Sequence, residues 1–169
     1  AGPNGSIIGD SPQQITLGDD GSAVEAVGDE GYSFIDWSDA STANPRTDTN
    51  VTTDVMVTAN FADITPPQSA VSVPDDTLAG TTITLNFNSS DAASGVDSTA
   101  LWVKIPGTND FTDTGLSQTG NSGTFTYIAN AGSGTYQFAT KSTDNASNVA
   151  PDPTIAEETI HLNATPNGP

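Results

Sequence analysis

Two short loops rich in aspartate and asparagine are the segments of this sequence whose residue types could do chemistry. They are residues 91–97, with the sequence DAASGVD, and residues 144–148, with the sequence DNASN. Carboxylate and amide oxygens are the hard ligands that calcium takes, about six to eight at a time, so turns that carry several of them suit a calcium site. The alternative is that Asp and Asn are ordinary turn residues that cap their own backbone. Neither loop has the spacing of an EF-hand.

Trp102 is a second candidate, for binding a ligand rather than a metal. In the run LWVKI at residues 101–105, the aliphatic residues share one strand face and Trp102 shares the other with Lys104. If the aliphatic side chains fill a core, the indole points outward, where it can stack on a sugar ring or on another protein. It can equally cover a junction between modules or lie beneath the loop at residues 106–114.

Catalytic chemistry has little support in the sequence. His161 is the single histidine and there is no cysteine, so neither a nucleophile–histidine–acid set nor a His/Cys metal site can be assembled. Aspartates are so numerous that a pair of neighbouring carboxylates does not nominate a glycosidase. No glycine-rich phosphate loop stands between a strand and a helix. We therefore expect a protein that is not an enzyme.

The net negative charge limits the classes of partner that this chain is expected to bind. The 169 residues include 21 acidic and 3 basic ones, for a formal net charge of −18. Nucleic acid and anionic membranes would repel such a chain, and no run approaches the roughly 20 apolar residues of a membrane-spanning helix. The acidic residues are spread along the sequence, which suits salty or divalent-rich water outside the cell. We expect no nucleic-acid partner, no membrane insertion and a monomer.

Short alternating runs of Thr, Val, Ile and aromatic residues, separated by Gly, Asn, Asp, Ser and Pro, predict an all-β protein. The predicted strands are residues 6–8, 13–17, 23–27, 32–37, 51–61, 69–73, 81–88, 100–105, 123–128, 135–142 and 159–163.

The best domain boundary is the segment DITPP at residues 63–67, because successive prolines deny ladder hydrogen bonds and hold the chain extended. We expect a first module at residues 1–62 and a second at residues 63–163. The sequence ATPNGP at residues 164–169 reads as a further linker toward a module that is not present. The chain has the composition of a piece of a longer multidomain protein.

The first module resembles the divergent internalin-type B-repeat of bacterial surface and secreted proteins. The resemblance covers residues 5–62 and rests on GSI at 5–7, GYSFIDWSD at 31–39, NPRTD at 44–48 and VTANF at 57–61. It implies a small β-grasp-like fold. One departure is Ala40, where the family usually turns on glycine.

The residue pattern of this module indicates that its large aromatic side chains and its arginine have structural roles. Strand alternation places Phe34 on one face with Tyr32 and Asp36, and Trp37 on the other with Ser33 and Ile35. A module this small must bury most of its large side chains, so Phe34 and Trp37 are expected in the core. Arg46 is the module's single cation, and we expect it to form ion pairs with the nearby carboxylates of Asp36, Asp39 or Asp48.

The second module resembles the immunoglobulin-like domains of bacterial extracellular proteins. The resemblance is carried by DITPP at 63–67, DAASGV at 91–96, PG at 106–107, FTDTGL at 111–116, GTYQF at 134–138 and TDNASN at 143–148. It implies a β-sandwich in which Tyr136 is the corner tyrosine, whose hydroxyl ties the strand to nearby backbone. Ser147 stands where the family generally has glycine.

The resemblance also implies what the two acidic loops do. Similar domains sometimes hold calcium near these loops, so the implied ligands are Asp91, Asp97, Asp144 and Asn145, with calcium as the one expected cofactor. For the whole chain we expect a non-catalytic accessory or stalk segment of a secreted or cell-surface bacterial protein, which contacts neighbouring domains of its own polypeptide. The alternative is an adhesive module that binds a polysaccharide or a surface protein, with Trp102 as the ligand-binding residue.

Overall fold

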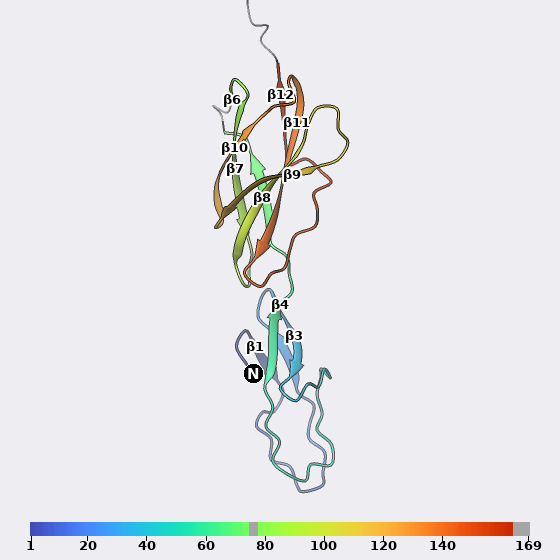
Figure 1. Ribbon diagram of the computed structural model, residues 1–169. Helices are drawn as coiled ribbons and strands as arrows, with labels where there is room; N and C mark the ends of the chain where they lie inside the picture. The colour runs from blue at the N-terminus through green and yellow to red at the C-terminus, as the bar shows by residue number, and fades with distance from the viewer. Residues whose placement is uncertain (75–77, 164–169) are drawn as a thin grey trace, which may run out of the picture. The chain divides into compact units, whose positions relative to one another are not determined.

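The computed structural model describes residues 1–74 and 78–163, and these residues form two compact units. The first unit spans residues 1–65 and the second begins at Pro66. All regular structure in the described residues is β-strand (Figure 1), so the predicted all-β class is confirmed. The predicted linker at residues 164–169 lies outside the described residues. Among the described residues no helix has the length and apolar character needed to cross a membrane.

The first unit is built from two antiparallel strand pairs. Strand β1 (Gly5–Ile8) pairs with β2 (Glu25–Gly28), and β3 (Tyr32–Trp37) pairs with β4 (Ala59–Asp63). Trp37 and two alanines form the buried centre of a small apolar core, against which larger side chains pack at their edges. The members of this core are Ala26, Trp37, Ala59, Ile7, Val24, Phe34, Val57 and Phe61.

A β-bulge in β3 changes which side chains enter this core. The pairing with β4 shifts between Phe34 and Asp36, so Ile35 is the extra residue and is 44% exposed. Because a bulge breaks the strict alternation of faces, Phe34 and Trp37 pack together, with ring centroids 5.6 Å apart. Trp37 is buried as expected and Phe34 is partly buried against the same core, but their predicted placement on opposite faces is wrong.

Two predicted strands of the first unit are loops. Residues 13–17 have no strand partner, and of residues 51–61 only the end, from Ala59 onward, belongs to a strand. Both segments are rich in β-branched and apolar residues, but a strand also needs a partner backbone along its length, which local composition does not supply. Strand β4 also runs through Asp63, whose backbone pairs with Tyr32, so the first unit extends to Thr65, past residue 62 where the sequence ends the first module.

The second unit is a sandwich of two four-stranded antiparallel sheets. One sheet contains β5 (Gln68–Ser72), β6 (Leu78–Ala79), β7 (Thr82–Ser90) and β10 (Ser122–Ile128). The other has the strand order β12 (Glu158–Leu162), β11 (Gly134–Asp144), β8 (Val96–Lys104) and β9 (Thr112–Thr119). Strands β6 and β9 are absent from the predicted set because polar residues dominate β9 and β6 has only two residues.

The core of the sandwich lies between the two sheets. Its fully buried members alternate along β7, β8 and β11, as expected for strands with one face in the core. They include Ile83, Leu85, Phe87, Leu101, Tyr136 and Phe138, and Phe125 on β10 is buried with them. The hydroxyl of Tyr136 donates to the carbonyl of Gly132 and accepts from the amide of Ala131, both at 3.0 Å. The predicted corner tyrosine is therefore confirmed.

Four of the described non-glycine residues adopt a backbone conformation that favours glycine, and two of them are not asparagine, the residue that tolerates this conformation best after glycine. Ala40 has a φ of 65° and Ser147 a φ of 72°, and both close turns in which their own amides bond to a carbonyl three residues back. A left-handed conformation costs an L-residue roughly 1–2 kcal/mol. These are the two positions at which the sequence departs from the glycine of each resembled family.

We expect Ala40→Gly and Ser147→Gly each to stabilise the unit that carries it by about 0.5–1 kcal/mol, because the relief of the left-handed conformation exceeds the entropy cost of glycine. Urea unfolding measures the change. The control substitutions Ala23→Gly and Ser90→Gly lie at exposed positions with ordinary φ values and should destabilise. Equal effects at all four positions would contradict the assignment of strain.

Candidate functional site

The acidic loops of the second unit come together at one end of the sandwich. Asp91 follows β7 directly and Asp144 is the last residue of β11, so the two strands deliver their carboxylates from opposite sheets. Carboxylate oxygens of Asp91 and Asp144 lie within 4.8 Å of each other. Asp144 is buried, with 2% of its surface exposed, and Asp91 is half-buried. The structure therefore brings these two predicted ligands together.

Each of these carboxylates also caps its own loop. Oδ1 of Asp91 accepts from the amides of Ala93 at 3.0 Å and Gly95 at 2.9 Å. Oδ1 of Asp144 accepts from the amide of Asn148 at 2.7 Å, and Oδ2 accepts from its Nδ2 at 2.8 Å. These bonds hold the oxygens in fixed positions. Turn capping and cation binding are compatible here, because a carboxylate has two oxygens with about four lone-pair sites between them.

The other two predicted ligands lie in different settings. Asn145 uses its side-chain amide to donate to the carbonyls of Ser94 at 2.8 Å and Gly95 at 3.2 Å, so it fastens one acidic loop to the other. Asp97 is exposed on β8, beside the bulge at which the pairing shifts between Thr143 and Asp144. Asp97 does not belong to the group of carboxylates close enough to share an ion.

A row of buried hydroxyls beneath the acidic loops was not anticipated from the sequence. Thr99 on β8 is hydrogen-bonded to Ser89 on β7 at 2.6 Å and to Ser142 on β11 at 2.8 Å. All three side chains are buried, and the row crosses from one sheet to the other. In the sequence, this row is indicated by a serine or threonine at strand positions where the alternation of faces points the side chain into the core. The row aligns the strand ends that carry Asp91 and Asp144.

Trp102 lies on the outer face of its sheet, as the alternation predicts, because its neighbours Leu101 and Val103 fill the core. The indole is half-buried, and the ammonium nitrogen of Lys141 lies 5.5 Å from the ring centroid. Lys141 also forms an ion pair with Asp152. Among buried polar atoms of the described residues, the indole Nε1 has no hydrogen-bond partner. Lys141 therefore covers part of the ring that a ligand would use.

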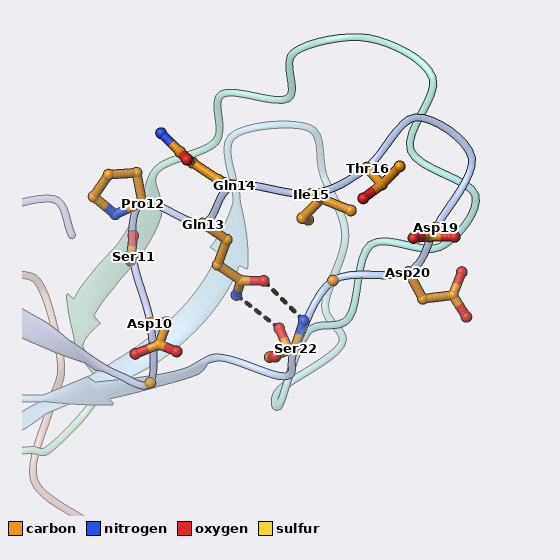
Figure 2. Close-up of a pocket in the computed structure, with 12 residues that line it drawn as sticks. Asp10, Ser11, Pro12, Gln13, Gln14, Ile15, Thr16, Asp19, Asp20 and Ser22 are labelled. Carbon is orange, nitrogen blue, oxygen red and sulfur yellow. Dashed lines mark hydrogen bonds between the residues drawn. The ribbon is translucent and has the colours of Figure 1, made fainter.

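In the first unit, the long loop at residues 9–23 borders an open pocket of about 650 Å³. Figure 2 shows the side chain of Gln13 turned across the loop toward Ser22. Its Nε2 donates to the Ser22 carbonyl and its Oε1 accepts from the Ser22 amide, both at 2.8 Å. The side chain of Gln13 thus replaces the strand partner that residues 13–17 lack.

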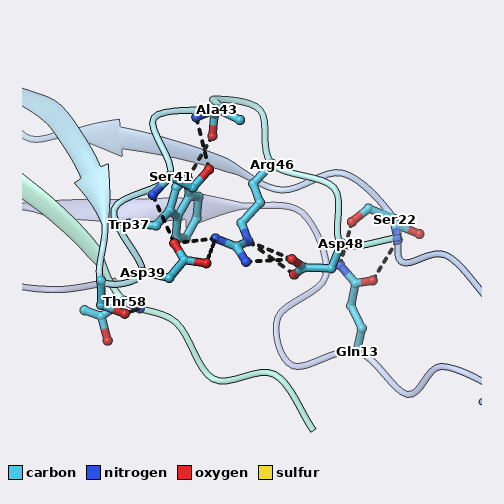
Figure 3. A network of polar contacts seen from close by, with 10 residues as sticks. Gln13, Ser22, Trp37, Asp39, Ser41, Ala43, Arg46, Asp48 and Thr58 are labelled. Carbon is cyan, nitrogen blue, oxygen red and sulfur yellow. Dashed lines mark hydrogen bonds and ion pairs between the residues drawn. The ribbon is translucent and has the colours of Figure 1, made fainter. Parts of the chain in front are cut away.

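Arg46 is a buried cation of the first unit, with 8% of its surface exposed (Figure 3). Its Nη1 donates to both carboxylate oxygens of Asp39, at 2.9 and 2.8 Å, and its Nε and Nη2 donate to Asp48. The guanidinium carbon lies 5.5 Å from the centre of the Trp37 ring. The expected ion pairs with Asp39 and Asp48 are confirmed, whereas Asp36 is hydrogen-bonded by Asn60 instead.

This arrangement makes the Arg46 network structural rather than catalytic. All five donors of a guanidinium point in fixed directions, and two carboxylates with an aromatic face satisfy most of them. The hydrogen bond from Arg46, followed by that from the Ser41 amide, holds the pKa of Asp39 below its usual value. The bond to Asp48, and then that to Asp39, raises the pKa of Arg46, which stays charged.

We expect Asp39→Asn to destabilise the first unit at pH 7, with a difference from the wild type that shrinks in acid. The folded-state pKa of Asp39 lies below its unfolded value, so its contribution is complete above about pH 4 and is lost as the pH falls through the lowered pKa. Urea midpoints of both proteins between pH 7 and pH 2 measure this. Asp29→Asn, at an exposed position, is the control, and a difference that persists unchanged at pH 2 would contradict the assignment.

The comparisons with known proteins bear on the first unit. Residues 1–65 match the family model of the divergent InlB B-repeat domain. The matched residues coincide with the first compact unit, which we call the B-repeat unit from here on. The match supports the resemblance carried by its aromatic strand and closing strand. No curated protein and no solved structure matches the chain.

Proposed function

We propose that this chain is a non-catalytic segment of a larger secreted or cell-surface protein, and that it spaces or presents other domains of the same polypeptide. The observation that carries the proposal is the match of residues 1–65 to a repeat domain of surface proteins. Repeat domains of this kind are non-enzymatic. The second unit, an all-β sandwich with a confirmed corner tyrosine, fits an immunoglobulin-like role as the next module in such a series.

The architecture supports a spacing role in physical terms. Each unit has its own apolar core, so each can remain folded when a neighbour is removed. The two units are joined at Thr65-Pro66-Pro67, where proline limits the backbone to extended conformations. The net charge of −18 opposes self-association, and so it favours a monomer.

The spacing role is tested in the parent protein by replacing residues 1–163 with an unrelated pair of β-domains of equal length. We expect ligand binding and activity of the neighbouring domains to be retained, because only the distance matters. A Trp102→Ala variant, tested in parallel, distinguishes the adhesive alternative from the spacing role. If that variant stays folded but loses a glycan-array or cell-binding signal, the spacing proposal fails and Trp102 is the ligand-binding residue.

A second proposal concerns calcium at the acidic loops, and the approach of Asp91 to Asp144 is the observation that favours it. Two carboxylates from opposite sheets, one of them buried, supply negative charge that a divalent cation would neutralise. Carbonyl and amide oxygens of the loop that contains Asn145 can complete the shell of about six to eight ligands, together with water. Bound calcium would fasten the ends of β7 and β11 to each other.

We expect 10 mM calcium to stabilise the second unit by about 2–3 kcal/mol if the dissociation constant is near 0.1 mM, since only the folded state holds the ligands together. Titration calorimetry and thermal unfolding of the full chain measure it. Asp144→Asn should abolish the effect, Asp97→Asn should show whether that exposed carboxylate contributes, and Asp113→Asn on β9 is the control. No heat at millimolar calcium would end the proposal.

A further inference from the structure

The B-repeat unit contains a groove of about 480 Å³ between its two long loops, residues 9–23 and 38–58. We call it the loop groove. Apolar side chains from both loops and from β1 line it, with Trp37 and Arg46 of the buried network also reaching it. Its apolar lining residues include Ile7, Ile15, Val51, Val55 and Met56. The groove is distinct from the acidic loops and from Trp102, which belong to the second unit.

Two of these apolar residues are exposed far more than a folded core requires. Met56 is 95% exposed and Val55 is 50% exposed, while the next residue, Val57, packs against the core. Val57 therefore contacts the core, whereas the side chains of Val55 and Met56 remain exposed to water. Exposed apolar residues that adjoin a concave surface gain free energy when a partner covers them.

The charges around the loop groove are negative. Asp10 and Asp54 lie among the lining residues, and Asp19 and Asp20 belong to the same loop (Figure 2). Arg46 is the single cationic side chain among the groove-lining residues, and its charge is neutralised by Asp39 and Asp48. The field at the groove therefore attracts cations and repels anions.

The lining and the charge of the loop groove discriminate among three kinds of occupant: a second copy of this chain, a sugar ring and a peptide. A second copy of this chain would bring another 18 negative charges to the groove, so charge opposes it. A sugar ring would need an open aromatic face, but Trp37 is 3% exposed and Arg46 lies over its ring. A peptide segment that combines apolar side chains with lysine or arginine satisfies both the apolar lining and the acidic rim.

We propose that the loop groove is a docking site for a basic, apolar peptide segment of a protein partner. The partner's aliphatic side chains occupy the space beside Val55 and Met56, and its cations lie against Asp10 and Asp54. This role goes beyond spacing, because a spacer needs no complementary surface. Electrostatic attraction would speed the encounter, and burial of the apolar side chains would slow dissociation.

The test uses the ¹⁵N-labelled full chain and a synthetic 12-residue peptide, (Lys-Leu-Gly-Ser) repeated three times. We expect peptide-induced chemical-shift changes at residues 9–23 and 48–58, and weaker binding at high salt. Met56→Ser should weaken binding about fivefold to tenfold and Asp54→Asn several-fold. The matched controls are Ile155→Ser, which removes a 79% exposed aliphatic side chain from the second unit, and Asp113→Asn, and both should leave binding unchanged.

Three further titrations identify other occupants. A peptide with Glu in place of Lys, and one with Ser in place of Leu, should both fail to shift these loops. Equal binding by either peptide overturns the proposal, as does the absence of any shift with the basic peptide. Shifts of the same loops by cellohexaose, or on concentrating the protein alone, would assign the groove to a glycan or to a second copy and overturn the proposal as well. Replacement of residues 1–163 in the parent tests spacing separately, so either proposal can fail without the other.

Discussion

Polar side chains that bond to backbone groups hold the loops of this protein, and the rest of the structure depends on this constraint. The chain has no cysteine and each apolar core is small, so neither disulfides nor a large core can fix long loops. Asn44 shows the principle, because its side chain both donates to and accepts from the backbone of Ala26 at 2.8 Å. Gln13 and Tyr136 likewise both donate to and accept from backbone, and Asp91 accepts from two amides of its own loop. These hydrogen bonds fix the loop conformations without a large apolar core beneath the loops.

The Arg46 network extends this principle to a buried charge. Removing a guanidinium from water is costly unless its donors are satisfied, and here two carboxylates and the Trp37 ring surround it. Asp39, Arg46 and Asp48 all lie in the second long loop, and the contact of Arg46 with the buried Trp37 ring ties that loop to the core. The network therefore fixes one wall of the loop groove, which connects the stability of the B-repeat unit to its candidate binding surface.

The carboxylate side chains of this chain fall into two structural groups. Most carboxylates are exposed and keep the surface solvated, whereas a few accept backbone amides and shape the loops. Asp91 and Asp144 belong to the second group and also approach each other. Like charges at this distance repel, so a bound cation would relieve a cost that the fold itself creates.

Local sequence determined the features that depend on neighbouring residues. Alternation predicted the all-β class and β3, the proline pair located the junction to within a few residues, and the strand patterns placed Tyr136 and Leu101 in the sandwich core. Motifs identified the B-repeat, which the family match supports. Tertiary structure alone decided the bulge at Ile35, the loop state of residues 13–17, the hydroxyl row around Thr99, and the approach of Asp91 to Asp144. The physical reason is that each of these depends on distances between residues far apart in the chain, which packing sets and local pattern does not encode.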